Sequence, residues 1–499
     1  MGNKMLPLVL AAALLASGPA SAAPGPEARS SLVIRGDGFI RSPVNAIPAP
    51  APKIRVRQNE VEIENQRTGT RYGVDIEVGT PPQKLTLILD TGSPDTWVNP
   101  TCQFANVPRD CESYPRYDHT KSRSINATRA VDTLVYGIGN STIQYVYETV
   151  KIGSATITNQ IIGIGLETHS IPLGILGLSP SVSGANEYPY ILDTMKSQGL
   201  IKSRAFSLDL RTVDSPDGAL IFGGIDTGKY IGNLEKLPML PIEQTPRRAD
   251  RYYVTMSGVG LTYPDGTATR SQQISVPVFL DSGGTLSRLP TPIFQAFADS
   301  FEGAEFDTRT GFYFLPCEVA DLAGSVDFYF GNKIISVPFN DFIWHVQGFC
   351  VLGVLPEDDE PVLGDTFLRA AYVVFDQDNR NLHIAQAANC GTNLVAIGSG
   401  KDAVPSQTGR CTARPPTATQ QGGLDVTATR GAPTALFTGQ GPTGVGVGPG
   451  PAASRVSGSG SLAEPTSTDS AENSAGKGMG IGSGMVAAMV VANVLSWML

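Results

Sequence analysis

Hydrophobic and polar positions alternate in short runs between residues 72 and 388, and Gly, Pro, Asn and Asp separate the runs. This pattern is typical of β-strands joined by turns. The clearest predicted strands are residues 72–78, 85–89, 143–152, 219–222 and 371–375. Helical patterns are few, and the best candidates are residues 189–198 and 292–301. The span therefore predicts an all-β fold with one large or two medium β-rich lobes.

The N-terminal region has a different pattern. Lys4 precedes the apolar run 6–15, and a small-residue motif, Ala-Ser-Ala, ends at Ala22. Residues 1–22 are therefore predicted to be a secretory signal peptide, since a membrane span needs about 20 apolar residues. Residues 23–66, rich in Pro, Ala, Arg and Val, are predicted to be a pro-segment. A mature N-terminus near residue 23 would contradict this prediction.

The C-terminal region matches the order of a GPI-attachment signal. Small residues at 473–475 precede a Gly-rich spacer at 476–484 and a mainly apolar tail at 485–499. We expect attachment at Asn473 or Ser474 and removal of residues 474–499. A C-terminal tail anchor is the alternative, although the tail is short for one. Residues 396–473, rich in Gly, Pro, Ser, Thr and Ala, predict a stalk that is either O-glycosylated or plainly disordered.

The amino-acid composition excludes some classes of function but does not identify one. Of 499 residues, 17% are charged and the net charge is -9, which excludes a basic nucleic-acid-binding surface. Six cysteines in a secreted chain predict disulfides, whose pairing the count leaves open, although Cys102 and Cys111 are close enough for a small loop. The four His are scattered, and neither C-x-x-C nor H-E-x-x-H occurs, so we predict no metal site. Two sequons predict N-glycosylation at Asn126 and Asn140.

One internal repeat contains candidate catalytic residues. An apolar strand ends in Asp-Thr-Gly at Asp90, and a second ends in Asp-Ser-Gly at Asp281. Each is followed at nearly the same interval by two apolar residues and Gly, at 175–177 and at 362–364. The matched intervals indicate duplicated lobes that would bring the two Asp together at their boundary. Another Asp-Thr-Gly, at Asp226, lacks the apolar approach and is predicted to be a turn.

Adjacent carboxyl groups suit the hydrolysis of an amide, which needs an activated water and a proton for the leaving nitrogen. Two carboxyl groups about 3 Å apart cannot both ionise, so they share one proton. The ionised group takes a proton from water, and the protonated group polarises the carbonyl. Both proton roles are then filled without a cofactor. Aspartic proteases are the known example of this arrangement.

Across residues 72–388 the chain resembles the pepsin-like aspartic proteases, and it is most similar to fungal GPI-anchored members of the yapsin type. The motifs that carry the resemblance are Asp90-Thr91-Gly92-Ser93 with Trp97, Tyr136-Gly137-Ile138-Gly139, and the segments 174–178 and 363–369. The resemblance implies two β-rich lobes, at 67–238 and 239–395, with a cleft between them.

The resemblance also implies roles for single residues. Asp90 and Asp281 would be catalytic, and Tyr136 would close a flap over the substrate with Trp97 as its hydrogen-bond partner. Core packing is the alternative for these two aromatic residues. Supporting residues would be Thr91, Gly92, Ser93, Ser282, Gly283 and Thr285, and the flap would include Gly137, Ile138 and Gly139. The pairs Cys102–Cys111 and Cys317–Cys350 match the family's lobe disulfides, which leaves Cys390 and Cys411 as a candidate third pair.

Three positions depart from the pattern or modify it. Gly284 stands where the family usually has Ser or Thr, so a hydroxyl beside the second Asp is lost and we expect a raised dyad pKa relative to a Gly284→Thr variant. Ile138 offers no partner for a cation, which predicts apolar side chains at that subsite, whereas the yapsin resemblance favours basic ones. A glycan on Asn140, directly after the flap, would narrow access to the cleft.

The sequence therefore predicts a monomeric, secreted and GPI-anchored aspartic endopeptidase at the plasma membrane or cell wall. Its partners would be polypeptide substrates and the membrane, and no nucleic acid is expected. A pepsin-fold binding protein without useful turnover is the alternative, and only Gly284 favours it. A structural wall glycoprotein is suggested only by the stalk and the anchor.

Overall fold

The computed structural model describes residues 35–36, 38–47, 55–57, 60–62, 71–412 and 437–438, with gaps at 106–107, 138, 185–187, 213–214, 216, 309–310 and 347. The chain divides into two compact units, Met1–Leu32 and Val33–Leu499. The first unit lies outside the described residues, so everything below concerns the second. The predicted signal peptide, Ile138, Asn473 and the predicted tail at 474–499 also lie outside the described residues.

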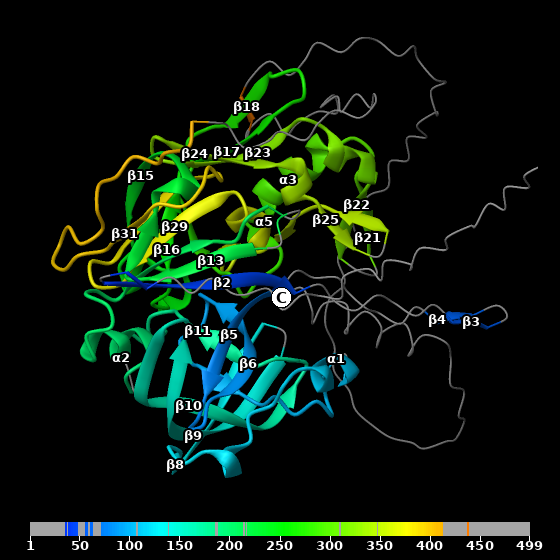
Figure 1. The fold of residues 1–499 in the computed structure, drawn as a ribbon. Coiled ribbons are helices and arrows are strands. Elements are labelled where there is room, and N and C mark those ends of the chain that lie inside the picture. Colours follow the sequence, from blue (N-terminus) through cyan, green and yellow to red (C-terminus); the bar gives the residue numbers. More distant parts are fainter. Residues whose placement is uncertain are drawn as a thin grey trace, which may run out of the picture. The chain divides into compact units, whose positions relative to one another are not determined.

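The fold is all-β with two lobes, as the sequence predicts (Figure 1). A 14-stranded sheet contains the strands of the first lobe and several from the end of the chain. Its strands are β1 (Arg35–Gly36), β2 (Phe39–Ile47), β5 (Arg71–Val78), β6 (Gln83–Asp90), β7 (Trp97–Val98), β8 (Asn126–Tyr136), β9 (Gly139–Ile152), β10 (Ala155–His169), β11 (Ile175–Gly177), β12 (Ala205–Asp209), β13 (Asp217–Phe222), β15 (Tyr230–Pro238), β29 (Ala371–Asp376) and β30 (Asn381–Ala387).

Smaller sheets build the second lobe. One five-stranded sheet contains β16 (Tyr253–Met256), β19 (Val276–Leu280), β20 (Ser287–Leu289), β27 (Val354–Pro356) and β28 (Val362–Leu363). Another contains β17 (Gly258–Thr262), β18 (Ala268–Ser271), β23 (Ser325–Phe330), β24 (Lys333–Pro338) and β32 (Phe437–Thr438). A four-stranded sheet contains β21 (Glu305–Asp307), β22 (Phe312–Leu315), β25 (Trp344–Val346) and β26 (Phe349–Val351). Two separate strand pairs are β14 (Gly224–Asp226) with β31 (Leu394–Ala396), and β3 (Arg55–Arg57) with β4 (Glu60–Glu62).

Helices are short in the described part of the chain. They are α1 (Pro108–Ser113), α2 (Ile191–Ser197), α3 (Thr291–Ser300), α4 (Phe339–Phe342) and α5 (Asp365–Leu368). The two predicted helices are confirmed as α2 and α3, and Pro292 lies in the first turn of α3, where its missing N–H costs no hydrogen bond. None of these helices has the length and apolar character that crossing a bilayer requires.

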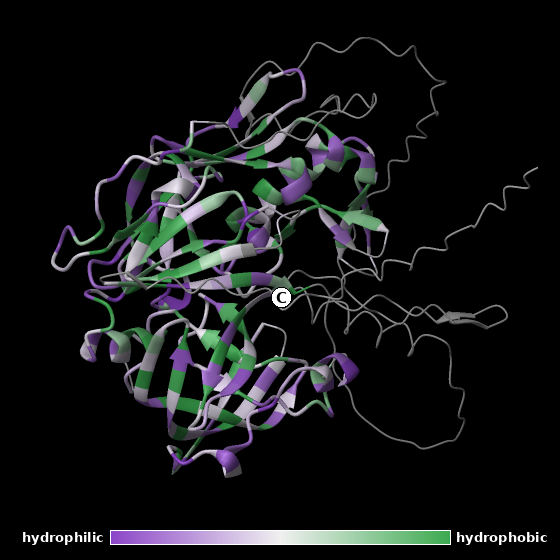
Figure 2. Cartoon of the chain, viewed as in Figure 1, coloured by the Kyte–Doolittle hydropathy of each residue, from purple (hydrophilic) through white to green (hydrophobic). Residues whose placement is uncertain are grey.

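Side-chain alternation places the core as the sequence pattern implies. Along β9, buried and half-buried positions alternate, with Ile143, Val146 and Val150 among the buried ones. Figure 2 shows the same alternation as green and purple bands along the strands. β6 departs from it toward its end, where Leu87, Ile88, Leu89 and Asp90 are all buried. A strand buried on both faces can deliver a polar residue to an enclosed site.

Strand β2 was not predicted from the sequence. It pairs with β13 on one side and β5 on the other, so it joins two parts of the large sheet (Figure 1). Its buried residues are Ile40, Ser42 and Val44, with half-buried Pro43 between the last two. Because Ser is polar and Pro is rare in strands, the sequence does not show the apolar–polar alternation that is typical of a strand. The strand belongs to the predicted pro-segment at 23–66, whose removal stays a prediction.

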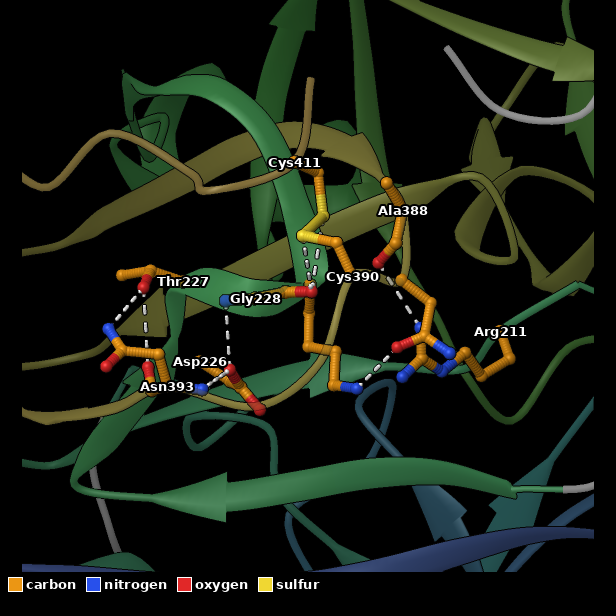
Figure 3. The surroundings of a disulfide bond; sticks show 10 residues. Arg211, Asp226, Thr227, Gly228, Ala388, Cys390, Asn393 and Cys411 are labelled. Carbon is orange, nitrogen blue, oxygen red and sulfur yellow. Dashed lines mark hydrogen bonds between the residues drawn. A yellow bond between two sulfur atoms is a disulfide. The ribbon is translucent and has the colours of Figure 1, made fainter. Parts of the chain in front are cut away.

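The expected start of the stalk at residue 396 is wrong for residues 396–412. Ile397, Ala403 and Val404 are buried against the large sheet, beside the β14–β31 pair. A disulfide between Cys390 and Cys411 closes this segment into a loop (Figure 3). We call residues 390–411 the C-terminal loop. The covalent closure lowers the entropy that a Gly-, Ser- and Pro-rich segment loses on folding, so a few apolar side chains suffice to order it.

Candidate active site

The two Asp-Thr/Ser-Gly turns sit at equivalent strand ends. Asp90 ends β6, and Asp281 directly follows β19. The repeated apolar-apolar-Gly segments form the parallel neighbours of these strands, with Leu176 opposite Leu89 in one lobe and Leu363 opposite Leu280 in the other. The sequence repeat therefore corresponds to a repeated three-dimensional frame around each Asp.

A reciprocal hydrogen-bond network joins the two turns. The Thr91 hydroxyl donates to the Leu280 carbonyl at 2.9 Å and accepts from the backbone N–H of Ser282 at 2.9 Å. The Ser282 hydroxyl donates to the Leu89 carbonyl at 2.9 Å and accepts from the Thr91 N–H at 3.2 Å. Each hydroxyl is buried and both donates and accepts, so the two turns are held in fixed register across the lobe boundary.

Glycine at the third position of each turn allows the carboxyl groups to approach. A Cβ on Gly92 would lie 2.7 Å from the Asp281 carboxyl atoms, and a Cβ on Gly283 would lie 2.7 Å from Asp90 Oδ1. Both distances are far below van der Waals contact, so a side chain at either position would displace the carboxyl groups. The structure thus brings together the two Asp that the sequence singled out.

Asp90 lies in an environment that favours its protonated form. It is 6% exposed, and burial, followed by the charge of Asp281, raises the pKa of Asp90 to about 7. Hydrogen bonds from the Ser93 hydroxyl and the Gly92 N–H act in the opposite direction and lower this pKa. A hydrogen bond between the two carboxyl groups adds to the raised value. Below about pH 7 the pair therefore retains a shared proton.

Asp281 has different neighbours. Its Oδ1 accepts from the Gly283 N–H at 2.8 Å, and a Cβ on Gly284 would lie 3.8 Å from its Oδ2. The space beside Oδ2 can thus accept a side chain, although Gly284 supplies none. Thr285 is buried, and its carbonyl accepts from the Thr366 N–H at 3.2 Å, which supports the turn.

The predicted flap is a β-hairpin formed by β8 and β9, with Tyr136 opposite Gly139. Trp97 donates from Nε1 to the Tyr136 hydroxyl at 2.8 Å. Burial, followed by the charge of Asp90, raises the pKa of Tyr136, so its phenol stays neutral. Trp97 is fully buried, which means that the core-packing alternative and the hydrogen-bonding role apply together.

A cavity of about 370 Å³ separates the flap from the two carboxyl groups, and its walls carry charge that the sequence analysis missed. Arg247, Arg251 and Arg288 line it together with Glu357 and Glu360. These residues are scattered along the chain and converge only through the pairing of β16, β19, β28 and β20. One signal was present in the sequence, since Arg288 interrupts an otherwise apolar and hydroxyl-rich run seven positions after Asp281.

A second compartment of about 250 Å³ adjoins the first and shares Gly92, Ser93 and Tyr136 with it. Asp95 lies in this compartment and accepts hydrogen bonds from the hydroxyl groups of Tyr145 and Tyr188. The cleft is therefore long enough to contact more than one residue of an extended chain.

The third Asp-Thr-Gly is confirmed as a turn. Asp226 is fully buried and caps a 3₁₀ turn at Thr227–Lys229, with Oδ1 accepting from the backbone N–H groups of Gly228 at 3.0 Å and Asn393 at 2.7 Å (Figure 3). The Cys390–Cys411 disulfide lies against the same turn, with both sulfur atoms within 3.4 Å of the Gly228 carbonyl oxygen. Asp226 fixes the C-terminal loop through Asn393 and is not among the residues that line the cavity.

Both lobe disulfides expected from the resemblance are present, Cys102–Cys111 and Cys317–Cys350. In the described residues, Cys317, His345 and Cys350 form a grouping of potential metal ligands, but the disulfide occupies both sulfur atoms. Asn126 is exposed at the start of β8 and Asn140 is half-buried at the start of β9. Their glycosylation stays a prediction.

Comparison with known proteins places this geometry in a family context. The model of the family described as eukaryotic aspartyl protease matches residues 71–387. The chain is 32% identical over 362 residues to the probable aspartic-type endopeptidase opsB of Aspergillus oryzae, covering 68% of this chain and 73% of the relative. It is 32% identical over 363 residues to aspartic proteinase yapsin-3 of Saccharomyces cerevisiae, covering 67% and 69%. The crystal structure of the aspartic proteinase from Irpex lacteus superposes with a TM-score of 0.52 at 25% identity, covering 64% of this chain and 94% of that one.

Proposed function

The chain belongs to the eukaryotic aspartyl protease family as an aspartic-type endopeptidase, and on this basis we propose that it cleaves polypeptides with a water activated between Asp90 and Asp281. The supporting observation is the meeting of the two carboxyl groups over paired glycines, with Asp90 buried and its pKa raised to about 7. Substrate would occupy the cavity between the carboxyl groups and the flap.

The proposed mechanism assigns one proton to the pair. Asp281, as the carboxylate, takes a proton from the attacking water, while Asp90, as the acid, donates a hydrogen bond to the peptide carbonyl. The pair then delivers a proton to the leaving nitrogen and returns to its starting state. Tyr136 and Trp97 hold the flap above the reacting bond, and the Thr91–Ser282 network keeps the carboxyl groups in register.

Proteolysis by the full chain, produced through a secretory pathway, tests this proposal. We expect cleavage of unfolded haemoglobin at about pH 4 that a statine-type inhibitor blocks and that Asp90→Asn or Asp281→Asn abolishes. Asp226→Asn is the matched control, because it alters the third Asp-Thr-Gly while its side-chain oxygen can still accept the two backbone hydrogen bonds. Unchanged proteolysis in either dyad variant would refute the assignment.

A binding protein with the same fold is the second candidate, favoured by the absent hydroxyl at Gly284. It predicts inhibitor binding without turnover. Isothermal titration with a statine-type inhibitor, beside the cleavage assay, separates the two candidates, since only the enzyme yields products.

We also propose that the protein is secreted and held at the cell surface by a GPI anchor at Asn473 or Ser474. The order of small residues, spacer and apolar tail supports this. Release of the protein from intact cells by a phosphatidylinositol-specific phospholipase is the expected result. Retention after that treatment, with release by detergent alone, would favour a tail anchor.

A further inference from the structure

The two carboxyl groups of the dyad are stabilised unequally by their own turns. Asp90 accepts from the Gly92 N–H and from the Ser93 hydroxyl, whereas the corresponding residue after Asp281 and Gly283 is Gly284, which has no side chain. A carboxylate that bears the negative charge in a partly buried site needs donors or a cation nearby. A cation in the cavity wall can supply such stabilisation, and Arg288 lines the same cavity as Asp281.

The pairing of the strands places Arg288 on the same face as Asp281. Arg288 of β20 lies opposite Val362 of β28, which in turn lies opposite Phe279 of β19. Directly paired residues share a face of the sheet, and Asp281 is two residues beyond Phe279, so all four side chains point the same way. Consistently, all four line the cavity beneath the flap.

The electrostatics of Arg288 agree with this placement. Burial lowers the pKa of Arg288, and the charge of Asp281 is the strongest influence that raises it again, ahead of Glu357 and Glu360. Such coupling is reciprocal: if the carboxylate favours the guanidinium cation, the cation favours the carboxylate by the same free energy. The guanidinium remains charged at every pH at which the dyad works.

We propose that Arg288 is a positioning residue that keeps the negative charge of the dyad on Asp281, replacing electrostatically the hydroxyl that position 284 lacks. The inference rests on the proposed function of the same site. It assigns Arg288 an effect on the ionisation of the pair without contact with the reacting bond. It also explains how Gly284 is compatible with an active dyad.

Other charged groups face Asp281 from neighbouring elements and belong to the same electrostatic balance. Asp90 approaches from the end of β6, and buried Asp365 approaches from α5, where burial raises the pKa of Asp365 well above its usual range. Glu357 and Glu360 precede β28, and Arg251 precedes β16. Glu360 is already paired with Arg251 at 3.3 Å and with Arg247 at 3.7 Å. Within this set, Asp281 is the carboxylate whose charge acts most strongly on Arg288.

The sign of the expected effect follows from the charge. Activity requires one negative charge on the dyad, so it is lost at low pH when the pair is fully protonated and at high pH when both groups ionise. Removing a nearby cation favours the protonated forms, so it raises the apparent pKa of both protonation steps of the dyad. Arg288→Met should therefore move both limbs of the pH profile of kcat/KM to higher pH, the acid limb by about one unit.

Matched variants of the full chain test the proposal by pH–rate profiles on one peptide substrate. Arg288→Lys keeps a cation and should leave both limbs within about 0.3 unit of the wild type. Gly284→Thr restores a hydroxyl, for which a Cβ at 3.8 Å leaves room, and should bring the acid limb of Arg288→Met back toward the wild-type value. Arg248→Met removes an exposed arginine outside the cavity and is the control that should change nothing.

The outcomes separate this inference from the function on which it rests. If the wild type cleaves peptides and Arg288→Met leaves both limbs in place, the role of Arg288 is refuted while the protease stands. If the wild type and Asp281→Asn are equally inactive, the proposed function fails as well. If Arg288→Met does not fold, Arg288→Gln retains hydrogen-bonding groups without charge and must show the same shift.

Discussion

Trp97 and Arg288 occupy equivalent places in the two lobes. Each lies seven positions after its Asp, and each closes a row of three paired strands: Ile88, Ile175 and Trp97 in the first lobe, and Phe279, Val362 and Arg288 in the second. The two side chains nevertheless have different interactions. Trp97 is neutral and fully buried and donates to the flap Tyr136, whereas Arg288 is charged, only half-buried and coupled to Asp281.

The difference shows which properties of a duplicated frame are repeated and which are not. Backbone register, the two glycines and the paired hydroxyls recur in both lobes, because the approach of two carboxyl groups depends on all of them. The residue at the end of the row is free to diverge, because it acts on only one partner. One lobe uses it to hold the flap, and the other to set the charge of the pair.

The largest expected effect comes from the two catalytic Asp residues, which both lobes share. Asp90→Asn and Asp281→Asn should each lower kcat/KM by at least about 1,000-fold, since either change leaves the pair unable to share one proton between two carboxyl groups. Steady-state cleavage of a fluorogenic peptide measures both. If only one variant lost activity, the two Asp would not act as a unit.

Loss of either hydroxyl in the Thr91–Ser282 network should destabilise the protein by a similar amount. Thr91→Ala and Ser282→Ala each leave buried backbone groups without a partner, so each should lower the free energy of unfolding by about 2 kcal/mol. Urea unfolding monitored by tryptophan fluorescence measures this, and Thr91→Ser with Ser282→Thr are the conservative controls. A large loss in one variant alone would show that the network is not reciprocal.

Substitutions of Trp97 and Arg288, the residues that differ between the two lobes, should have different kinetic effects. Trp97→Phe removes the 2.8 Å hydrogen bond to Tyr136 and should reduce kcat/KM by about tenfold without moving the pH profile. Arg288→Met should move the profile instead. Tyr136→Phe breaks the same hydrogen bond from the other side and should match Trp97→Phe. A shifted profile in Trp97→Phe would remove the distinction between the two lobes.

The smallest expected effect concerns the hydroxyl that only the first lobe has. The Ser93 hydroxyl lowers the pKa of Asp90, which burial and Asp281 raise to about 7. Activity should therefore fall as the pH rises through about 7, and Ser93→Ala should move this basic limb upward by about half a unit. A pH profile of kcat/KM decides this, and a downward shift would contradict the assigned hydrogen bond.

Much of the frame could be predicted from the sequence because its signals are local. The Asp-Thr/Ser-Gly turns, the apolar strands before them and the apolar-apolar-Gly neighbours are each readable within a few residues. The strand before Asp90 and the helices α2 and α3 followed from periodicity in the same way. Even the third Asp-Thr-Gly could be set aside, because glycines interrupt its approach.

The features that were missed depend on partners far away in the chain. Arg251 and Glu360 meet only because β16, β19 and β28 are adjacent, and sequence spacing does not carry that information. Strand β2 was hidden because polar Ser42 is one of its buried residues and Pro43, a residue that is rare in strands, lies next to it. Val404 looked like part of a polar tail because the residues that bury it, such as Tyr230 and Tyr372, lie far away in the sequence.

The Cys390–Cys411 disulfide also decides where mechanical tension enters the folded body. A pull on the chain beyond Cys411 passes through the sulfur–sulfur bond to Cys390, three residues after the end of β30, and so bypasses residues 391–410 between the two cysteines. β31 therefore bears none of the load. For the same reason, a single cut within that stretch would leave the two fragments covalently joined.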